Sequence, residues 1–161
     1  MSELEQDHAL LLETVREGGA LALSYFHDGV KHWDKGHDDP VSEADHAVDD
    51  LLRRKLLEGR PNYGWLSEET EDDPKRMDCR DIWIVDPIDG TRAFIQQRAE
   101  FTVCAALVRN GRPVAGAVYN PAKEEFYDVS KDPAQVHNLV GDPKFAKELN
   151  RHRKLLDDWL A

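Results

Sequence analysis

The apolar residues near the start of the chain recur at the spacing of a helix. They are Leu4, Leu11, Leu12, Val15, Gly19, Ala22 and Phe26. This spacing predicts an amphipathic helix over residues 3–27. Gly18 and Gly19 should each cost about 1 kcal/mol relative to alanine inside a helix. We therefore expect a close contact with another helix or with a sheet at these two glycines.

A second helix is predicted to start at Ser42 and to stop at Gly59-Arg60-Pro61. Its buried stripe consists of Ala44, Val48, Leu51, Leu52 and Leu56. The segment between the two helices, residues 28–41, is polar and rich in turn-forming residues. It is therefore expected to be a loop or a small hairpin.

Short apolar runs then predict strands over residues 63–67, 81–86, 101–109, 113–119 and 124–129. The run 101–109 is apolar on both faces, so it should be a central strand. Asn110-Gly111 is a strong signal for a two-residue hairpin. The order predicts an α+β fold in which two N-terminal helices pack on a mostly antiparallel sheet.

The composition changes after about residue 128. Residues 130–143 read as irregular, and Asp142-Pro143 resembles the start of a terminal helix. The stripe of that helix would be Phe145, Leu149, His152, Leu156 and Trp159. We accordingly predict one domain over residues 1–128 and a loop with a helical tail over residues 129–161.

The charge of the chain restricts its partners. There are 32 acidic and 21 basic residues among 161, which gives a formal net charge of −11. Such a surface repels nucleic-acid polymers and anionic membranes, and a phosphate substrate would need metal cations beside it. Two separate cysteines, no basic segment at the start and no long apolar run lead us to expect a cytoplasmic protein without a membrane span.

Residues 81–91 carry the strongest chemical signal. An apolar strand leads to Asp86, Pro87 should end its pairing, and Asp89, Gly90 and Thr91 follow. Two carboxylates this close repel each other unless a cation or a proton lies between them. Their hard oxygens suit Mg²⁺ or Ca²⁺, and a helix opening at Thr91 would aim backbone amides at an anion. A plain turn also explains Asp-Pro-x-Asp-Gly, so both interpretations stay open.

Two further acidic positions have equally simple alternatives. Glu68 and Glu69 follow the strand 63–67, but they also begin an acidic run that could be a solvated loop. Asp45 lies three residues after Ser42, as in an imperfect capping box. The sequence contains no phosphate-binding P-loop, no paired zinc histidines and no serine nucleophile elbow.

Together these motifs resemble the inositol monophosphatase-like family of Mg²⁺-dependent, Li⁺-sensitive phosphomonoesterases. The matching segments are PVSEAD, WLSEET and DPIDGT, in the family's order and rough spacing, within residues 4–127. The closest resemblance is to the bacterial CysQ-type 3′(2′),5′-bisphosphate nucleotidases. It is carried by WDKG, PNYGWLSEET, VDPIDGTRAFI, EFTV and GRPVAGAVYNPA.

The resemblance implies a role for each acidic residue. Glu68, Asp86 and the carbonyl of Ile88 would hold one Mg²⁺, and Asp86 with Asp89 would hold a second. Glu69 would be an accessory to the first ligand. The family uses two or three such ions, and Li⁺ is expected to inhibit.

The resemblance also implies the remaining catalytic groups. Asp45 would accept a hydrogen bond from Thr91, whose hydroxyl helps deprotonate the attacking water. The amides of Gly90 and Thr91 would hold the phosphate of a small phosphorylated metabolite. We thus expect a phosphomonoester hydrolase, with a catalytically silent metal-binding, phosphate-binding or oligomerising domain as the alternative.

The sequence departs from the family after about residue 127. The family continues into a second half with a Trp-Asp-x-Ala-Ala-Gly motif that completes a metal site, and nothing here matches it. Residues 125–161 instead resemble the C-terminal tail of type I sulfatases, without the sulfatase nucleophile motif. An impaired activity and a homo-oligomer formed through an exposed sheet edge are therefore expected.

Overall fold

The computed structural model describes residues 2–36, 40–129 and the single residues 131, 134, 137, 138 and 143. The terminal helix predicted after Pro143 lies outside the described residues, and so does most of the sulfatase-like tail. The expected division of the chain at residue 128 therefore stays a prediction.

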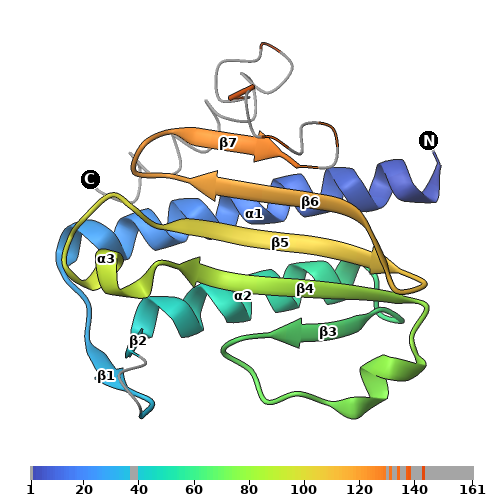
Figure 1. The fold of residues 1–161 in the computed structure, drawn as a ribbon, viewed down its shortest axis with the longest axis horizontal. Helices are drawn as coiled ribbons and strands as arrows, with labels where there is room; N and C mark the ends of the chain where they lie inside the picture. Colours follow the sequence, from blue (N-terminus) through green and yellow to red (C-terminus); the bar gives the residue numbers. More distant parts are fainter. Residues whose placement is uncertain are drawn as a thin grey trace.

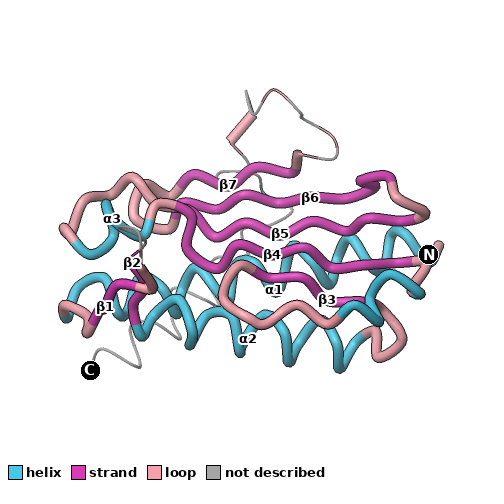
Figure 2. Tube along the Cα trace, turned by 60° about the horizontal axis from the view of Figure 1, so that its bottom comes forward, coloured by secondary structure: helices cyan, strands magenta, loops and turns pink. Residues whose placement is uncertain are grey.

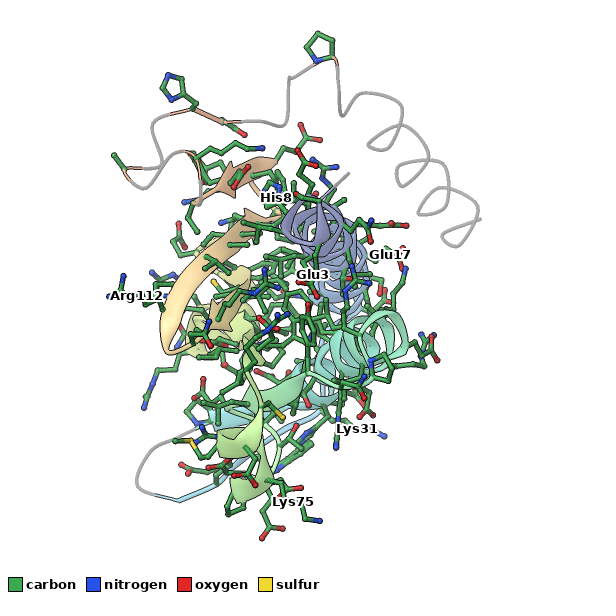
Figure 3. The ribbon with its side chains drawn as sticks, turned by 90° about the vertical axis from the view of Figure 1, so that its right-hand side faces the viewer. Glu3, His8, Glu17, Lys31, Lys75 and Arg112 are labelled. Carbon is green, nitrogen blue, oxygen red and sulfur yellow. The ribbon has the colours of Figure 1, made fainter. Side chains whose placement is uncertain are left out.

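The described chain is an α+β structure, as the hydrophobic pattern predicts. Two long helices, α1 (Glu3–Asp28) and α2 (Glu43–Gly59), lie on one side of a five-stranded sheet (Figures 1 and 3). The strands are β3 (Gly64–Ser67), β4 (Asp81–Asp89), β5 (Thr102–Arg109), β6 (Arg112–Asn120) and β7 (Glu125–Asp128), in that order across the sheet. β3 is parallel to β4, and all other neighbours are antiparallel.

Three smaller elements complete the described chain. The segment 28–41 contains a hairpin of β1 (His32–Asp34) and β2 (Pro40–Ser42), in agreement with the prediction. A short helix α3 (Thr91–Ile95) follows β4, and a 3₁₀ helix η1 (Pro74–Asp78) precedes it. The sequence pattern does not predict η1, because a single 3₁₀ turn is too short to show a period.

Helix α1 begins at a capping box. The Ser2 amide donates to the Glu5 carboxylate at 2.7 Å, and the Glu5 amide donates to the Ser2 hydroxyl at 3.3 Å. Farther along the helix, a Cβ on Gly18 would lie 2.9 Å from Leu52 of α2, and one on Gly19 would overlap the Tyr119 ring of β6. The close contact predicted for the two glycines is thus present on both sides, with a helix and with the sheet.

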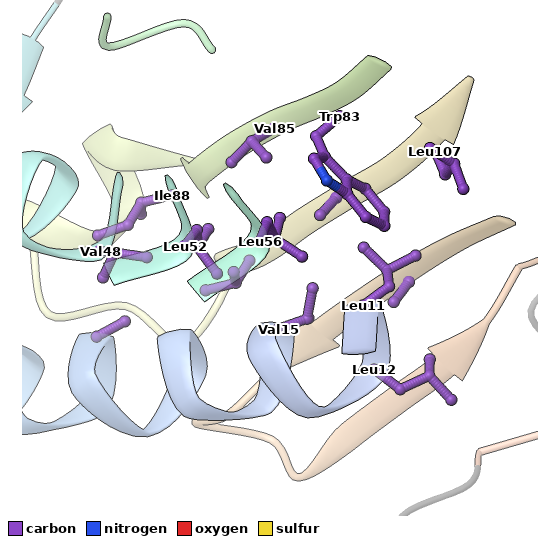
Figure 4. Packing of buried hydrophobic residues seen from close by; sticks show 14 of the residues in the cluster. Leu11, Leu12, Val15, Val48, Leu52, Leu56, Trp83, Val85, Ile88 and Leu107 are labelled. Carbon is purple, nitrogen blue, oxygen red and sulfur yellow. The ribbon is translucent and has the colours of Figure 1, made fainter. Parts of the chain in front are cut away.

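The core lies between the two helices and the sheet. Its largest fully buried side chains are Trp83, Phe94, Phe101 and Phe126. Figure 4 shows Val15 of α1 and Leu52 of α2 facing Val85 of β4. Each fully buried side chain of this size stabilises the fold by about 1.5–3 kcal/mol.

The middle of the sheet agrees with the predicted turn chemistry. β5 lies third of the five strands, and Asn110 and Gly111 join it to β6 with φ values of 51° and 73°. Both residues occupy the left-handed region that a type I′ hairpin requires. The opposite face of the sheet carries Ile84, which is 38% exposed, and neither α1 nor α2 packs there.

The end of β4 differs from the prediction. We expected Pro87 to stop the pairing at Asp86, but β4 continues to Asp89, whose partner is Thr102. The register shifts between Asp86 and Asp89. Proline has no amide hydrogen to donate, and a local irregularity lets the pairing resume beyond it. None of the described helices has the apolar length that crossing a bilayer requires.

Candidate functional site

Three acidic segments meet at one end of the sheet. Because β3 and β4 are parallel, with Ser67 opposite Val85, both strands end at the same edge. Glu68 therefore follows β3 close to the place where β4 reaches Asp86. The start of α2, the hairpin β1–β2 and α3 lie at this same end (Figures 1 and 2). The fold thus brings together the segments that the sequence motifs single out.

Asp45 and Thr91 contact each other directly. The Thr91 hydroxyl lies 3.0 Å from Asp45 Oδ1 and 3.0 Å from the carbonyl oxygen of Ile88. This confirms the hydrogen bond that the resemblance implies. The other oxygen of Asp45 accepts from the Ser42 amide at 2.8 Å and from the Ser42 hydroxyl at 2.5 Å. Asp45 therefore serves both interpretations, since one oxygen caps α2 and the other holds Thr91.

Gly90 occupies a position that other residues fit poorly. Its φ is 92°, and a Cβ there would lie 2.6 Å from the carbonyl oxygen of Glu100. Helix α3 starts at the next residue, and the Phe94 amide donates to the Gly90 carbonyl at 3.1 Å. The tight turn into α3 is therefore present, while the phosphate contact predicted for the Gly90 and Thr91 amides stays a prediction.

The site concentrates negative charge. Burial, together with Glu68, Asp89, Asp45 and Glu69, raises the pKa of Asp86 to about 7. Burial is the largest cause, because the half-buried carboxylate loses water, and the neighbouring carboxylates add repulsion. A plain surface turn would not perturb an aspartate in this way. The electrostatics favour a site that receives a cation or a proton.

Glu69 is held by a lysine that the sequence analysis did not single out. Lys35 Nζ lies 2.7 Å from Glu69 Oε2, and the Glu69 side chain is 5% exposed. Burial raises the pKa of Glu69, although Lys35 acts in the opposite direction. Lys35 lies in the WDKG segment just after β1. In the sequence, only the position of Lys35 within WDKG pointed to a role for this lysine at the site.

Asp49 is the second residue that the sequence analysis missed. It is 4% exposed on α2, and its carboxylate accepts hydrogen bonds from the hydroxyls of Ser67 and Thr70. A signal existed, because Asp49 lies four residues after Asp45 on the same helix face as the apolar Val48 and Leu52. Acidic residues on a buried stripe need a partner.

The donor set fits Mg²⁺ in its chemistry. The candidate ligands are three carboxylates, Glu68, Asp86 and Asp89, and the Ile88 carbonyl, which are hard oxygen donors. In the described part of the chain, however, no three acidic, histidine or cysteine side chains stand close enough to hold one ion. The carboxylates of Glu68, Asp86 and Asp89 are therefore not already arranged around a single metal position.

Comparisons with known proteins agree with the motifs. Residues 3–150 match the sequence profile of the Inositol monophosphatase family. The inositol-1-monophosphatase of Rhizobium meliloti (strain 1021) is 41% identical over 97 residues, which are 60% of this chain and 36% of that protein. The 3′(2′),5′-bisphosphate nucleotidase CysQ of Escherichia coli (strain K12) is 36% identical over 120 residues, covering 70% of this chain and 48% of that protein.

The fold has solved counterparts as well. The crystal structure of extragenic suppressor protein suhB from Bartonella henselae superposes with a TM-score of 0.71 at 30% identity. The match covers 74% of this chain and 47% of that one. The chain thus spans less than half the length of the relatives described here.

Proposed function

Because the chain belongs to the inositol monophosphatase family, we propose that it is a Mg²⁺-dependent phosphomonoester hydrolase. The observation that best supports this proposal is the bond between Thr91 and Asp45 beside Asp86, whose pKa is raised to about 7. A hydroxyl held by a carboxylate, next to further carboxylates that could bind Mg²⁺, suits the metal-assisted hydrolysis of a phosphate ester.

The ligand assignment follows the family resemblance, and the chemistry of the donors is compatible with it. Glu68, Asp86 and the Ile88 carbonyl would hold one Mg²⁺, and Asp86 with Asp89 would hold a second. Mg²⁺ takes only one or two carboxylates and completes its shell with water and substrate phosphate. When bound, the ions would lower the pKa of the attacking water and stabilise the leaving oxygen.

The protein groups would position and deprotonate that water. Asp45 accepts the hydroxyl hydrogen of Thr91, which leaves the Thr91 oxygen free to accept a proton. The Gly90 and Thr91 amides would bind the substrate phosphate where the chain turns into α3. Glu69, which is paired with Lys35, would act as an accessory rather than as a direct ligand.

We further propose that the substrate is a 3′(2′),5′-bisphosphate nucleotide or a similarly small phosphorylated metabolite. The support is the set of CysQ-like segments and the 36% identity to the Escherichia coli nucleotidase. This chain has a net charge of −11, so it would depend on bound cations to bind an anionic substrate of this kind.

The decisive assay measures phosphate release from a panel that contains adenosine 3′,5′-bisphosphate and inositol 1-phosphate, with and without Mg²⁺ and Li⁺. The wild-type protein should release phosphate only with Mg²⁺, and Li⁺ should inhibit this release. The Asp89→Asn variant should be inactive. Asp50→Asn, an exposed change on α2, is the matched control and should behave as wild type. Release that ignores Mg²⁺ would contradict the proposal. An inert oligomer would favour the silent domain instead.

A further inference from the structure

The segment that bears Glu68 and Glu69 is hydrogen-bonded at both of its ends to one residue. The Ser67 hydroxyl donates to Asp49 Oδ1 and the Thr70 hydroxyl donates to Asp49 Oδ2. Ser67 immediately precedes Glu68, and Thr70 immediately follows Glu69. The two glutamates are therefore bracketed by bonds to a single buried carboxylate.

Each of these hydroxyls is also oriented from its other side. The Glu69 amide donates to the Ser67 oxygen at 3.2 Å, and the Trp65 indole nitrogen donates to the Thr70 oxygen at 3.4 Å. A hydroxyl has one hydrogen to give, and here both give it to Asp49. The direction of every bond in the set is thus fixed, and both oxygens of Asp49 act as acceptors.

Helix α2 connects this arrangement to the other half of the site. Asp45 holds Thr91 at the turn after β4, and Asp49 holds the segment after β3. The two aspartates are four residues apart, so about one helical turn and roughly 6 Å along the axis separate them. One rigid helix therefore sets the position of Glu68 and Glu69 relative to that of Asp86 and Asp89.

A carboxylate is a costly choice for a purely structural position on this stripe. Asp49 is 4% exposed between Val48 and Leu52, where an apolar residue would pack without losing hydration. Neither Ser67 nor Thr70 has been given a role in the chemistry above. Because they lie on either side of the two glutamates, their bonds to Asp49 would fix the position of this segment.

We propose that Asp49 is a positioning residue of the metal site, which acts through Ser67 and Thr70 to hold Glu68 in place for the ion. This inference rests on the proposed metal-dependent function. Residues that orient metal ligands typically change metal affinity by about 10–100-fold when they are replaced. We expect an effect of that size here, on metal affinity more than on substrate affinity.

The test measures binding of Mn²⁺ alone by electron paramagnetic resonance, without substrate, beside the thermal unfolding midpoint. Asp49→Asn should weaken Mn²⁺ binding by at least about tenfold, while Asp50→Asn should match wild type. Thr70→Val removes one hydroxyl at nearly constant volume and should also weaken binding. Thr70→Ser keeps the hydroxyl and should bind Mn²⁺ as wild type does. If Thr70→Val acted only through lost packing, Thr70→Ser would weaken binding too.

The outcomes separate this inference from the proposed function. If wild type binds Mn²⁺ and Asp49→Asn and Thr70→Val bind it equally well, Asp49 has no positioning role, although the metal site stands. If wild type binds no Mn²⁺, the proposed function fails and this inference fails with it. If Asp49→Asn does not fold, the contrast between Thr70→Val and Thr70→Ser decides the question.

Discussion

The Thr91 hydroxyl lies 3.0 Å from Asp45 Oδ1 although 46 residues separate the two in the sequence. The bond joins the start of α2 to the turn after β4. Through this contact Asp45, which lies on α2 and not at the end of a strand, reaches the proposed catalytic residue Thr91. Its loss has a direct consequence.

Thr91→Val should reduce phosphate release by about 100-fold or more, because the proton acceptor is removed. It should also lower the free energy of unfolding by about 1 kcal/mol, since Asp45 Oδ1 loses its partner. Steady-state kinetics and urea unfolding measure the two effects. Thr91→Ser keeps the hydroxyl and should stay close to wild type. Equal rates for Thr91→Val and Thr91→Ser would exclude a proton-transfer role.

Mg²⁺ should stabilise the protein more at pH 8 than at pH 5. Burial and neighbouring carboxylates raise the pKa of Asp86 from 3.8 to about 7 in the folded protein. The folded state therefore binds this proton more tightly than the unfolded state, so the contribution favours folding at low pH and is lost as the pH rises toward 7. Above that pH only a cation relieves the repulsion.

Thermal unfolding with and without Mg²⁺ at the two pH values measures this effect, at about 2–4 °C for each kcal/mol. Asp86→Asn should unfold at a higher temperature than wild type at pH 8 without metal, and Mg²⁺ should then have little effect. Asp50→Asn should retain the wild-type response. A Mg²⁺ effect of equal size at pH 5 and pH 8 would count against the assignment of Asp86.

Gly90→Ala should destabilise the fold by about 1–2 kcal/mol from its left-handed backbone alone. The contact of a new Cβ with the Glu100 carbonyl oxygen should add to this, because a backbone oxygen cannot move aside. Urea unfolding measures the loss. Gly111→Ala is the matched control, since Gly111 lies in the left-handed region of the hairpin turn with a φ of 73° but nothing lies within 4 Å of its Cβ position. Equal losses in the two variants would show that the Glu100 contact has no cost.

Association through a sheet edge is expected at β3 rather than at β7. The Phe126 amide of β7 donates to the Asn138 side chain at 3.0 Å, and Asn138 in turn donates to the Glu124 carbonyl at 3.1 Å. These bonds occupy backbone groups along the β7 edge. Sedimentation velocity should show a dimer that Leu66→Lys in β3 weakens, because a charge on an edge strand disfavours pairing. A wild-type monomer at every concentration would rule the association out.

Much of the fold follows from local patterns. Helical spacing predicts α1 and α2 within a residue or two, and Asn110-Gly111 predicts the hairpin, because both signals act over a few neighbouring residues. Local patterns did not predict where β4 ends. The effect of Pro87 depends on how β5 pairs beyond it, which a local rule does not describe.

The candidate site divides in the same way. The acidic motifs were visible in the sequence, and so was the pairing of Asp45 with Thr91 through the family resemblance. The contact of Lys35 with Glu69 and those of Asp49 with Ser67 and Thr70 were not. They join residues that are 18 or more positions apart, and no periodicity states which distant side chains meet.

The four-residue interval between Asp45 and Asp49 also limits how this chain can change in length. One residue inserted into that interval would turn Asp49 by about 100° around the helix, away from Ser67 and Thr70. The exposed connection over residues 71–80 carries no such constraint on angle. Insertions and deletions should therefore be tolerated in that connection and rejected in the first turns of α2.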